Sequence, residues 1–244
     1  MKTVILSNLL LLAAGGALAA DPLARYEHDS FDTGKGKLAI YFFGHASLMM
    51  TWGTIVVYVD PVTEHADYAR LPKAGLVLVT HEHFDHLDAK AIAAISRKHT
   101  KIVLNQASRD KLGKGDALKN GDSTTVDGIT IRAVPAYNYT AGHEQFHPKG
   151  GRDNGYVLTI GGKTIYIAGD TEDIPEMADL RNIDIAFLPM NQPYTMTPQQ
   201  VAHAVEMIRP KVLYPYHYGD TDTDELVKLL KDAKGTELRI RKMK

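Results

Sequence analysis

Six residues that follow a short apolar run constrain the fold most. The run Leu76–Thr80 is long enough for a buried strand, and the segment His81–His86, His-Glu-His-Phe-Asp-His, comes directly after it. In α/β proteins the site is built from loops at the carboxyl ends of such strands. Imidazole and carboxylate groups suit zinc and related metals, and one ion binds only three or four of them. The segment therefore predicts an α/β fold with a metal site, and its ligand density indicates two metals; a polar turn that happens to be rich in histidine is the alternative.

Side chains that can bind metals recur at the ends of other predicted strands. They are Asp60 after residues 55–59, Asp170 after residues 165–169, His217 after residues 212–216, and Asn138 and then His147 after the strand that ends at Val134. If these strand ends share one edge of the fold, the side chains converge on one cleft.

The rest of the chain predicts two sheets covered by helices. A capping box at Thr197–Gln200, with proline at the first helical position, begins a helix that Pro210 ends, and Asp88 caps another that runs to about Lys98. A third helix is expected over residues 224–231. Strands are expected over residues 38–43, 46–51, 54–59, 101–104, 129–134, 156–160, 163–168, 183–188, 211–216 and 237–240. Hairpins followed by β-α-β units, twice over, predict a four-layered α/β arrangement.

Composition narrows the class of protein. The 244 residues are 44% hydrophobic and 23% charged, which is enough for one sizeable globular domain. The net charge of −1 gives no support for a nucleic-acid partner, so a small-molecule substrate is expected. The chain has no cysteine, which excludes disulfides and thiolate metal ligands.

The first residues have the order of a secretory signal peptide. A positive start at Lys2, an apolar stretch over residues 4–14 and the small-x-small site Ala17-Leu18-Ala19 follow one another. We expect a signal peptide over residues 1–19, a single folded domain over residues 20–244, and a periplasmic or secreted protein. An uncleaved membrane anchor is the alternative, but the apolar stretch is short for a span of about 20 residues.

Taken together, these motifs resemble the metallo-β-lactamase superfamily. The resemblance rests on H-x-H-x-D-H after a strand, an Asp at the end of an earlier strand, Ala-Gly-Asp-Thr at residues 168–171 and a late strand that ends in His. Phe43–Ser47, Val134–Ala136 and Pro215–His217 are similar to motifs of the branch that holds ascorbate-6-phosphate lactonase-like and N-acyl-phosphatidylethanolamine phospholipase D-like proteins. The resemblance implies an αββα sandwich, the metallo-β-lactamase fold, with a binuclear metal site between its sheets.

The same resemblance implies a role for each motif residue. Asp85 is expected to bind metal and to handle a proton, and Asp60 to orient a ligand imidazole. The implied ligands are His81 and His83 for the first metal, Asp85, His86 and His217 for the second, and Asp170 as the bridge between them.

The third histidine of the first metal is open. Relatives often carry it just after the Val-Pro-Ala stretch, where this chain has Asn138. His147 is the candidate replacement and His143 its rival. A missing ligand is the remaining alternative, and it would put the filling of the first site in doubt.

The implied ligand set predicts a metal-dependent hydrolase, and the signal peptide predicts that it is exported. Nitrogen and oxygen donors suit two zinc ions, or manganese or ferrous iron. Two cations lower the pKa of a bridging water from about 15.7 toward neutrality, so hydroxide is the expected nucleophile on an ester, lactone, amide or phosphodiester. The alternatives are a β-lactamase, which the absence of the expected mid-chain Gly-His motif disfavours, and a non-catalytic metal-binding or redox module.

Several nearby residues have two interpretations. His45 is either a pocket group or an ordinary turn histidine, and His203 is expected on the surface. A group of side chains close in sequence to the ligands either walls a substrate pocket or packs in the core: Tyr137, Tyr139, Tyr194, Met196 and Tyr218. The stretches 61–73 and 138–154 are long enough to be loops that cover a substrate.

Overall fold

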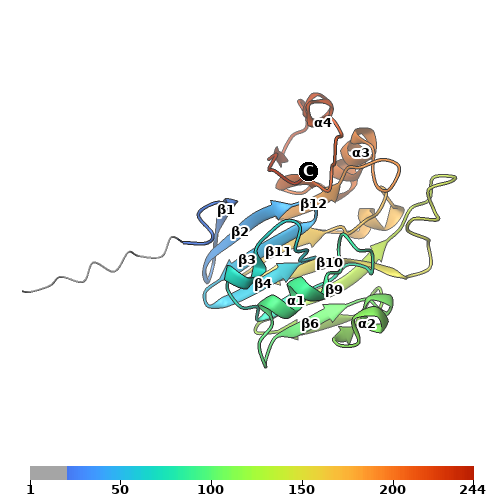
Figure 1. Cartoon of the computed structure of the whole chain (residues 1–244). Helices are drawn as coiled ribbons and strands as arrows, with labels where there is room; N and C mark the ends of the chain where they lie inside the picture. The colour runs from blue at the N-terminus through green and yellow to red at the C-terminus, as the bar shows by residue number, and fades with distance from the viewer. Residues whose placement is uncertain (1–20) are drawn as a thin grey trace, which may run out of the picture.

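The computed structural model describes residues 21–244, so the predicted signal peptide lies outside the described residues. Within these residues the chain forms two seven-stranded sheets, one from each half of the sequence (Figure 1). No helix among them is long and apolar enough to cross a membrane.

The first sheet holds its strands in chain order. Strands β1 to β4 pair antiparallel and β4 to β7 pair parallel. The strands are β1 (Glu27–Thr33), β2 (Gly36–Gly44), β3 (Ser47–Trp52), β4 (Ile55–Val59), β5 (Leu76–Leu78), β6 (Lys101–Leu104) and β7 (Asp116–Ala117). Helices α1 (Ala89–Ile95) and α2 (Gln106–Leu112) connect the parallel strands, and a short 3-10 helix, η1 (Tyr68–Arg70), precedes β5.

The second sheet repeats this plan in the order β14-β13-β12-β11-β10-β9-β8. In chain order, strands β8 to β11 pair antiparallel and strands β11 to β14 pair parallel. The strands are β8 (Ser123–Val126), β9 (Ile129–Ala136), β10 (Asp153–Ile160), β11 (Lys163–Ile167), β12 (Ile185–Pro189), β13 (Val212–Tyr216) and β14 (Glu237–Leu238). Helices α3 (Pro198–Ile208) and α4 (Thr223–Leu229) connect its parallel strands, and η2 (Pro175–Asp179) follows β11.

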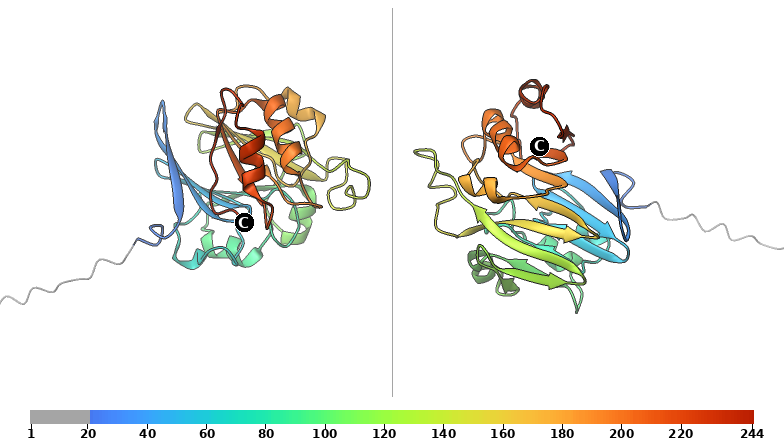
Figure 2. Two further views of the ribbon diagram at one scale, coloured as in Figure 1. Left: turned by 90° about the horizontal axis from the view of Figure 1, so that it is seen from above. Right: turned by 180° about the vertical axis from the view of Figure 1, so that it is seen from behind.

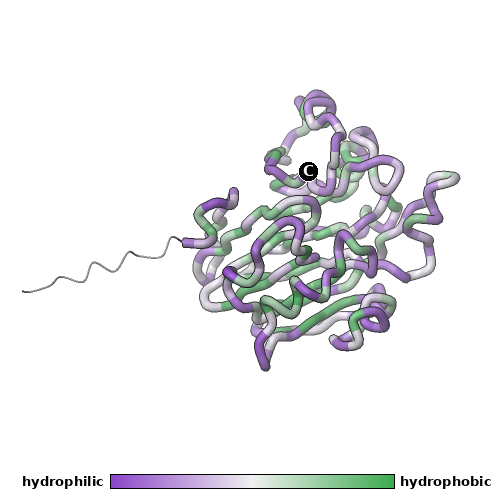
Figure 3. Tube along the Cα trace, in the orientation of Figure 1, coloured by the Kyte–Doolittle hydropathy of each residue, from purple (hydrophilic) through white to green (hydrophobic). Residues whose placement is uncertain are grey.

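The two sheets bury a common apolar core between them. In β2 the side chains of Leu38, Ile40 and Phe42 alternate toward this core, as the two-residue period of a strand requires. Phe187 of β12 faces them from the second sheet, with ring centroids 6.4 Å from Phe42. Hydrophobic stretches accordingly follow the strands of the interior, and hydrophilic stretches follow the outer loops (Figure 3).

Helices cover the outer face of each sheet. Ile92 and Ile95 of α1 pack in one cluster with Val77 of β5, and Val201 of α3 packs in another with Leu188 of β12. Seen from above, the helices of the two halves lie on opposite sides of the paired sheets (Figure 2, left). The predicted four-layered αββα sandwich is confirmed.

Local chemistry explains where the helices begin and end. Asp88 accepts hydrogen bonds from the backbone N–H groups of Lys90 and Ala91, and the capping box of α3 forms in both directions. Helix α1 ends at Ile95, before the predicted Lys98, because Ser96 is extended and its hydroxyl donates to the Ile92 carbonyl. Strand β1 and helix α2 were not predicted, since neither has an apolar run with clear periodicity.

Candidate metal centre

Three imidazoles from two segments form the first ligand group. His81 and His83 follow β5, and His147 lies between β9 and β10. Their ligand atoms lie within 4.8 Å of one another. The ring centroids are 4.5 Å apart for His81 and His83 and 4.9 Å apart for His83 and His147. The structure therefore brings His147 to the H-x-H pair from more than sixty positions further along the chain.

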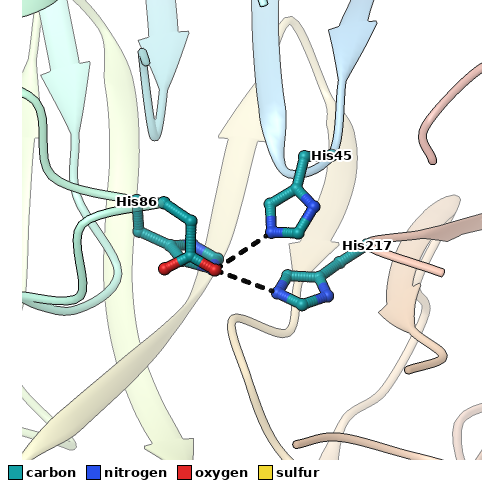
Figure 4. A group of neighbouring side chains, drawn as sticks. His45, His86 and His217 are labelled. Carbon is teal, nitrogen blue, oxygen red and sulfur yellow. Dashed lines mark hydrogen bonds and ion pairs between the residues drawn. The ribbon is translucent and has the colours of Figure 1, made fainter. Parts of the chain in front are cut away.

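A second group lies beside the first and has ligand atoms within 4.8 Å of one another: His45, Asp85, His86 and His217. The imidazoles of His45 and His217 point toward the same carboxylate oxygen, with Nε2 atoms 3.2 Å and 3.7 Å from Asp85 Oδ2 (Figure 4). His217 directly follows β13, and His45 lies in the turn between β2 and β3. Strand ends of both sheets thus contribute to one group.

The Asp170 carboxylate lies between the two groups. Its oxygens contact one imidazole nitrogen from each of four histidines: His86 Nε2 at 3.4 Å, His217 Nε2 at 3.2 Å, His147 Nε2 at 3.4 Å and His81 Nε2 at 3.8 Å. The preceding Gly169 has φ = +67°, and a Cβ there would lie 2.8 Å from the Asn154 carbonyl oxygen. Only glycine fits this turn, which aims Asp170 at both groups.

The orphaned polar atoms of this centre fit a metal. Among the described residues, buried atoms without a hydrogen-bond partner include His81 Nε2, His86 Nε2, His217 Nε2 and Asp170 Oδ1. Leaving a buried polar group unpaired costs about 1–3 kcal/mol. All of these atoms are nitrogen or oxygen donors that face one another, so divalent cations would satisfy them together.

Asp60 orients one of the imidazoles. Its Oδ2 lies 2.8 Å from His86 Nδ1 and accepts the Thr80 hydroxyl at 2.7 Å, while its Oδ1 accepts the Thr80 N–H at 2.8 Å. Thr80 Oγ1 in turn lies 3.0 Å from His81 Nδ1. Because Nδ1 of each ring is engaged, Nε2 of each faces the centre.

A carboxylate that the sequence analysis did not single out performs the same task for His147. Asp153 Oδ2 lies 3.0 Å from His147 Nδ1. Arg152 donates to both oxygens of Asp153, each at 2.7 Å, and to the Phe146 carbonyl at 2.9 Å. The only sequence feature that points to this role of Asp153 is its position next to Arg152 and shortly after His147, and this feature is weak by itself.

Asn138 and His143 have other partners. The Asn138 N–H donates to the His147 carbonyl at 2.7 Å, and its side chain donates to the Tyr194 carbonyl at 2.7 Å. His143 Nδ1 lies 3.3 Å from Glu172 Oε1 and belongs to neither ligand group. The residue that stands where relatives carry a histidine therefore anchors the loop that delivers His147.

His45 is more than a turn histidine. Its backbone has φ = +52°, its N–H donates to the Lys244 carbonyl, and its carbonyl accepts the His217 N–H at 2.9 Å. Its ring centroid lies 3.7 Å from that of His217. Of the two sequence interpretations, the structure places it as a group of the centre.

The electrostatics of the centre suit cation binding. Burial lowers the pKa of His81 well below its ordinary value, so this imidazole is neutral and can donate a lone pair. Burial raises the pKa of Asp170, but His217 and His86 outweigh it and hold that pKa well below the ordinary value. Burial lowers the pKa of His217, but Asp170 outweighs it and raises the pKa to about 9, so a cation that binds this imidazole would displace its proton. Asp170 is therefore ionised at neutral pH.

A cavity of about 560 Å³ opens over both ligand groups. Besides the ligands it is lined by Glu82, Phe84, Lys111, Phe146, Asn191 and Tyr194. Of the five candidate wall residues, only Tyr194 lines the cavity. Met196 packs in the hydrophobic cluster between the second sheet and α3, and the Tyr218 hydroxyl donates to the Arg241 carbonyl. The hydroxyls of Tyr137 and Tyr139 donate to Glu176 and Asp173.

The two long stretches and His203 also have defined places. The stretch 138–154 supplies Phe146 and His147 to the cavity, whereas no residue of the stretch 61–73 is among its lining residues. His203 is exposed, as expected, with Nδ1 2.6 Å from Asp173 Oδ2.

Comparisons with known proteins identify the family of this chain. Residues 39–217 match the family model described as "Beta-lactamase superfamily domain". A UPF0173 metal-dependent hydrolase of Pelotomaculum thermopropionicum is 32% identical over 222 residues, which cover 83% of this chain and 96% of that protein. A UPF0173 metal-dependent hydrolase of Thermococcus kodakarensis is also 32% identical, over 79% of this chain and 92% of that protein.

Solved structures agree as well. A crystal structure from Parabacteroides distasonis is 56% identical, with a TM-score of 0.87 over 90% of this chain and 100% of that one. Igni18, a metallo hydrolase of Ignicoccus hospitalis, is 23% identical, with a TM-score of 0.70 over 84% of this chain and 95% of that one. This is a likeness of fold alone. The predicted superfamily is confirmed, while the narrower likeness to the lactonase-like and phospholipase D-like branch stays a prediction. The chain belongs to the metallo-β-lactamase superfamily and, within it, to the UPF0173 family of metal-dependent hydrolases.

Proposed function

We propose that this hydrolase binds two divalent cations and cleaves an ester, lactone, amide or phosphodiester bond of a small molecule. The position of Asp170 is the observation that carries the proposal, because one carboxylate contacts imidazoles of both ligand groups. A single-metal site needs three or four ligands. The two groups together offer twice that number, so a second cation accounts for the surplus.

The ligands divide between the cations by group. The first cation would be held by His81, His83 and His147, the second by Asp85, His86 and His217, and Asp170 would serve both. His45, the fourth member of the second group, would hold Asp85 in place, since its Nε2 lies 3.2 Å from Asp85 Oδ2. When bound, the cations supply Lewis acidity that activates water and polarises the scissile bond. Nitrogen and oxygen ligands favour zinc, with manganese or ferrous iron as alternatives.

Asp85 is the residue proposed to handle the proton. Both Asp85 and Asp170 line the cavity, but the side chain of Asp85 is 27% exposed and that of Asp170 only 3%. Burial raises the pKa of Asp85, but His217 and His45 outweigh burial and lower it, so the carboxylate is ionised at neutral pH. It can therefore accept a proton from the attacking water and return it to the leaving group, while Asp60 keeps His86 in place.

The substrate is proposed to be small and the protein to be exported. A cavity of about 560 Å³ falls in the size range of small-molecule sites. A net charge of −1 does not favour a nucleic acid. The N-terminal sequence pattern supports export, and sequencing the N-terminus of the periplasmic or secreted protein should find Ala20 first. Protein that starts at Met1 in the membrane fraction would contradict export.

Elemental analysis with a panel of ester, lactone, amide, phosphodiester and β-lactam substrates tests the function. We expect about two zinc ions per chain and turnover that a chelator removes, and Asp170→Ala should lose both ions and at least 1000-fold in kcat/KM. A metal-replete, active Asp170→Ala protein would refute the bridging role. If the protein holds iron and hydrolyses none of these substrates, a redox module would be favoured. If it holds less than one ion per chain and shows no turnover, a non-catalytic protein would be favoured.

A further inference from the structure

We infer that the substrate carries an apolar aryl or acyl group beside the bond that is cleaved. This group would lie on an aromatic rim, defined as Phe84, Phe146 and Tyr194, whose side chains all line the cavity. The inference rests on the proposed function of the same cavity and specifies the class of substrate.

Phe84 is the first part of the rim. Among the large hydrophobic side chains of residues 21–244 it is the most exposed, at 81%. An exposed phenyl ring is less favourable in water than a buried one, so a ring left open beside a site indicates an apolar ligand. Phe84 lies between His83 and Asp85 in sequence, so its distance from the ligand groups is set by the chain.

Phe146 and Tyr194 form the second part. Their rings meet edge to face, with centroids 4.9 Å apart and an interplanar angle of 72°. Their backbones are tied down, because Asn138 donates to the Tyr194 carbonyl at 2.7 Å and Arg152 donates to the Phe146 carbonyl at 2.9 Å. This part of the rim is therefore held in place before a substrate arrives.

The charged part of the cavity does not favour a polyanion. Lys111 supplies the one ammonium among the lining residues, and it donates to the Glu82 carbonyl at 2.6 Å. Glu82 lies beside it with Oε2 buried and without a hydrogen-bond partner, and its Oε1 is 3.6 Å from Arg152 Nη1. A multiply charged anion would meet this carboxylate, whereas a neutral apolar group would not.

Binding of simple carboxylates tests the rim whichever bond the enzyme cleaves. The carboxylate group would bind at the cations, as a carboxylate product would. The gain in affinity with a longer alkyl chain then measures its contact with the aromatic rim. Isothermal titration calorimetry of the zinc-loaded protein should give a Kd for hexanoate at least tenfold below that for acetate, since one fully buried methylene contributes about fourfold. Equal affinities, or no measurable binding of hexanoate, would overturn the inference.

Variants locate the effect. Phe84→Ala should reduce the hexanoate preference over acetate at least threefold, and Phe84→Leu should restore most of it. Leu229→Ala is the matched control, because Leu229 is an exposed apolar side chain of α4 that does not line the cavity. An unchanged preference in Phe84→Ala and in Phe146→Ala would mean that the chain binds elsewhere, which also overturns the inference.

The two proposals fail separately. A protein that holds two metals and hydrolyses a substrate, yet binds acetate and hexanoate alike, would keep the proposed function and lose the rim. A protein that prefers hexanoate through Phe84 but hydrolyses nothing in the panel would keep the rim as a binding site and lose the proposed bond cleavage.

Discussion

At the residue scale, two imidazoles of the centre, those of His86 and His147, are oriented by a carboxylate that belongs to neither ligand group. Asp60 lies 2.8 Å from His86, and Asp153 lies 3.0 Å from His147. A hydrogen bond at Nδ1 fixes the tautomer and directs Nε2 to the cation. The quality of the site therefore depends on residues outside the two ligand groups.

The roles of the two loop histidines can be separated directly. His147→Ala should lose about one metal ion per chain, because one of three imidazoles of its group disappears. His143→Ala should keep the metal content, since His143 pairs with Glu172 instead. Inductively coupled plasma mass spectrometry of both variants measures this, with His203→Ala as an exposed control. Equal metal content in the His147 and His143 variants would contradict the assignment.

The orienting carboxylate of His147 should affect affinity more than stoichiometry. Asp153→Asn keeps the shape but loses the negative charge that strengthens the His147 hydrogen bond, so zinc affinity should fall about 10–100-fold for one ion. Competition with a chromophoric chelator measures the affinity. Asp184→Asn removes a carboxylate that pairs with Lys211 away from the centre, and it should leave both affinities unchanged. A normal affinity in Asp153→Asn would remove Asp153 from the centre.

At the element scale, strand ends deliver the ligands and tight turns aim them. Asp60, His217 and His45 have positive φ angles of 42°, 48° and 52°. Such conformations cost non-glycine residues on the order of 1–3 kcal/mol and persist only where surrounding contacts hold them. For His217 and His45 a contact crosses between the sheets, from the His217 N–H to the His45 carbonyl, whereas Asp60 is held within the first half by its bonds to Leu78 and Thr80.

A pair of glycines separates turn geometry from general strain. Gly169 and Gly162 have φ of +67° and +90°, but an added Cβ meets the Asn154 carbonyl at 2.8 Å in the first and nothing within 4 Å in the second. Gly162→Ala should cost about 1–2 kcal/mol of unfolding free energy and keep both metals. Gly169→Ala should displace Asp170 and lose metal as well. Urea unfolding and metal analysis check both, and a metal-replete Gly169→Ala protein would contradict the close approach.

At the scale of the whole molecule, the centre joins the two halves of the sandwich. His81, His83, Asp85 and His86 come from the first sheet, and His147, Asp170 and His217 come from the second. The C-terminal segment reinforces the junction, since Arg241 donates to both oxygens of Asp29 at 2.7 and 2.8 Å and the Lys244 carbonyl accepts the His45 N–H. Cations would therefore act as a link between sheets.

Metal removal should then destabilise the entire fold. A ligand at 100 times its Kd adds about 2.7 kcal/mol to the folded state, and each kcal/mol moves Tm by about 2–4 °C at this size. Removal of two such ions should lower Tm by roughly 10–20 °C. Differential scanning calorimetry measures the shift, and the Asp170→Ala protein should show almost none. A chelator-independent Tm in a protein shown to hold two ions would refute the link.

The residues that the sequence could locate are those that end a strand. The segment 81–86, Asp60, Asp170 and His217 each follow an apolar run, and the direction of a strand decides where its last residue lies. The same runs, with their capped helices, predicted the four layers. The sequence did not predict strand β1, because Phe31 is its only apolar residue. This strand is held by pairing with β2 and by the hydrogen bonds of Asp29.

Only the tertiary structure decided which residues meet away from those strand ends. The stretch 138–154 has no periodicity, so its path depends on distant contacts, such as the bonds from the Tyr139 and Thr140 N–H groups to Glu172. That path brings His147 to the centre and leaves His143 outside. The reach of His45 to Asp85 and the aromatic rim arise in the same way. Local patterns determine elements and their ends, whereas loop paths follow from hydrogen bonds and packing between segments that lie far apart in sequence.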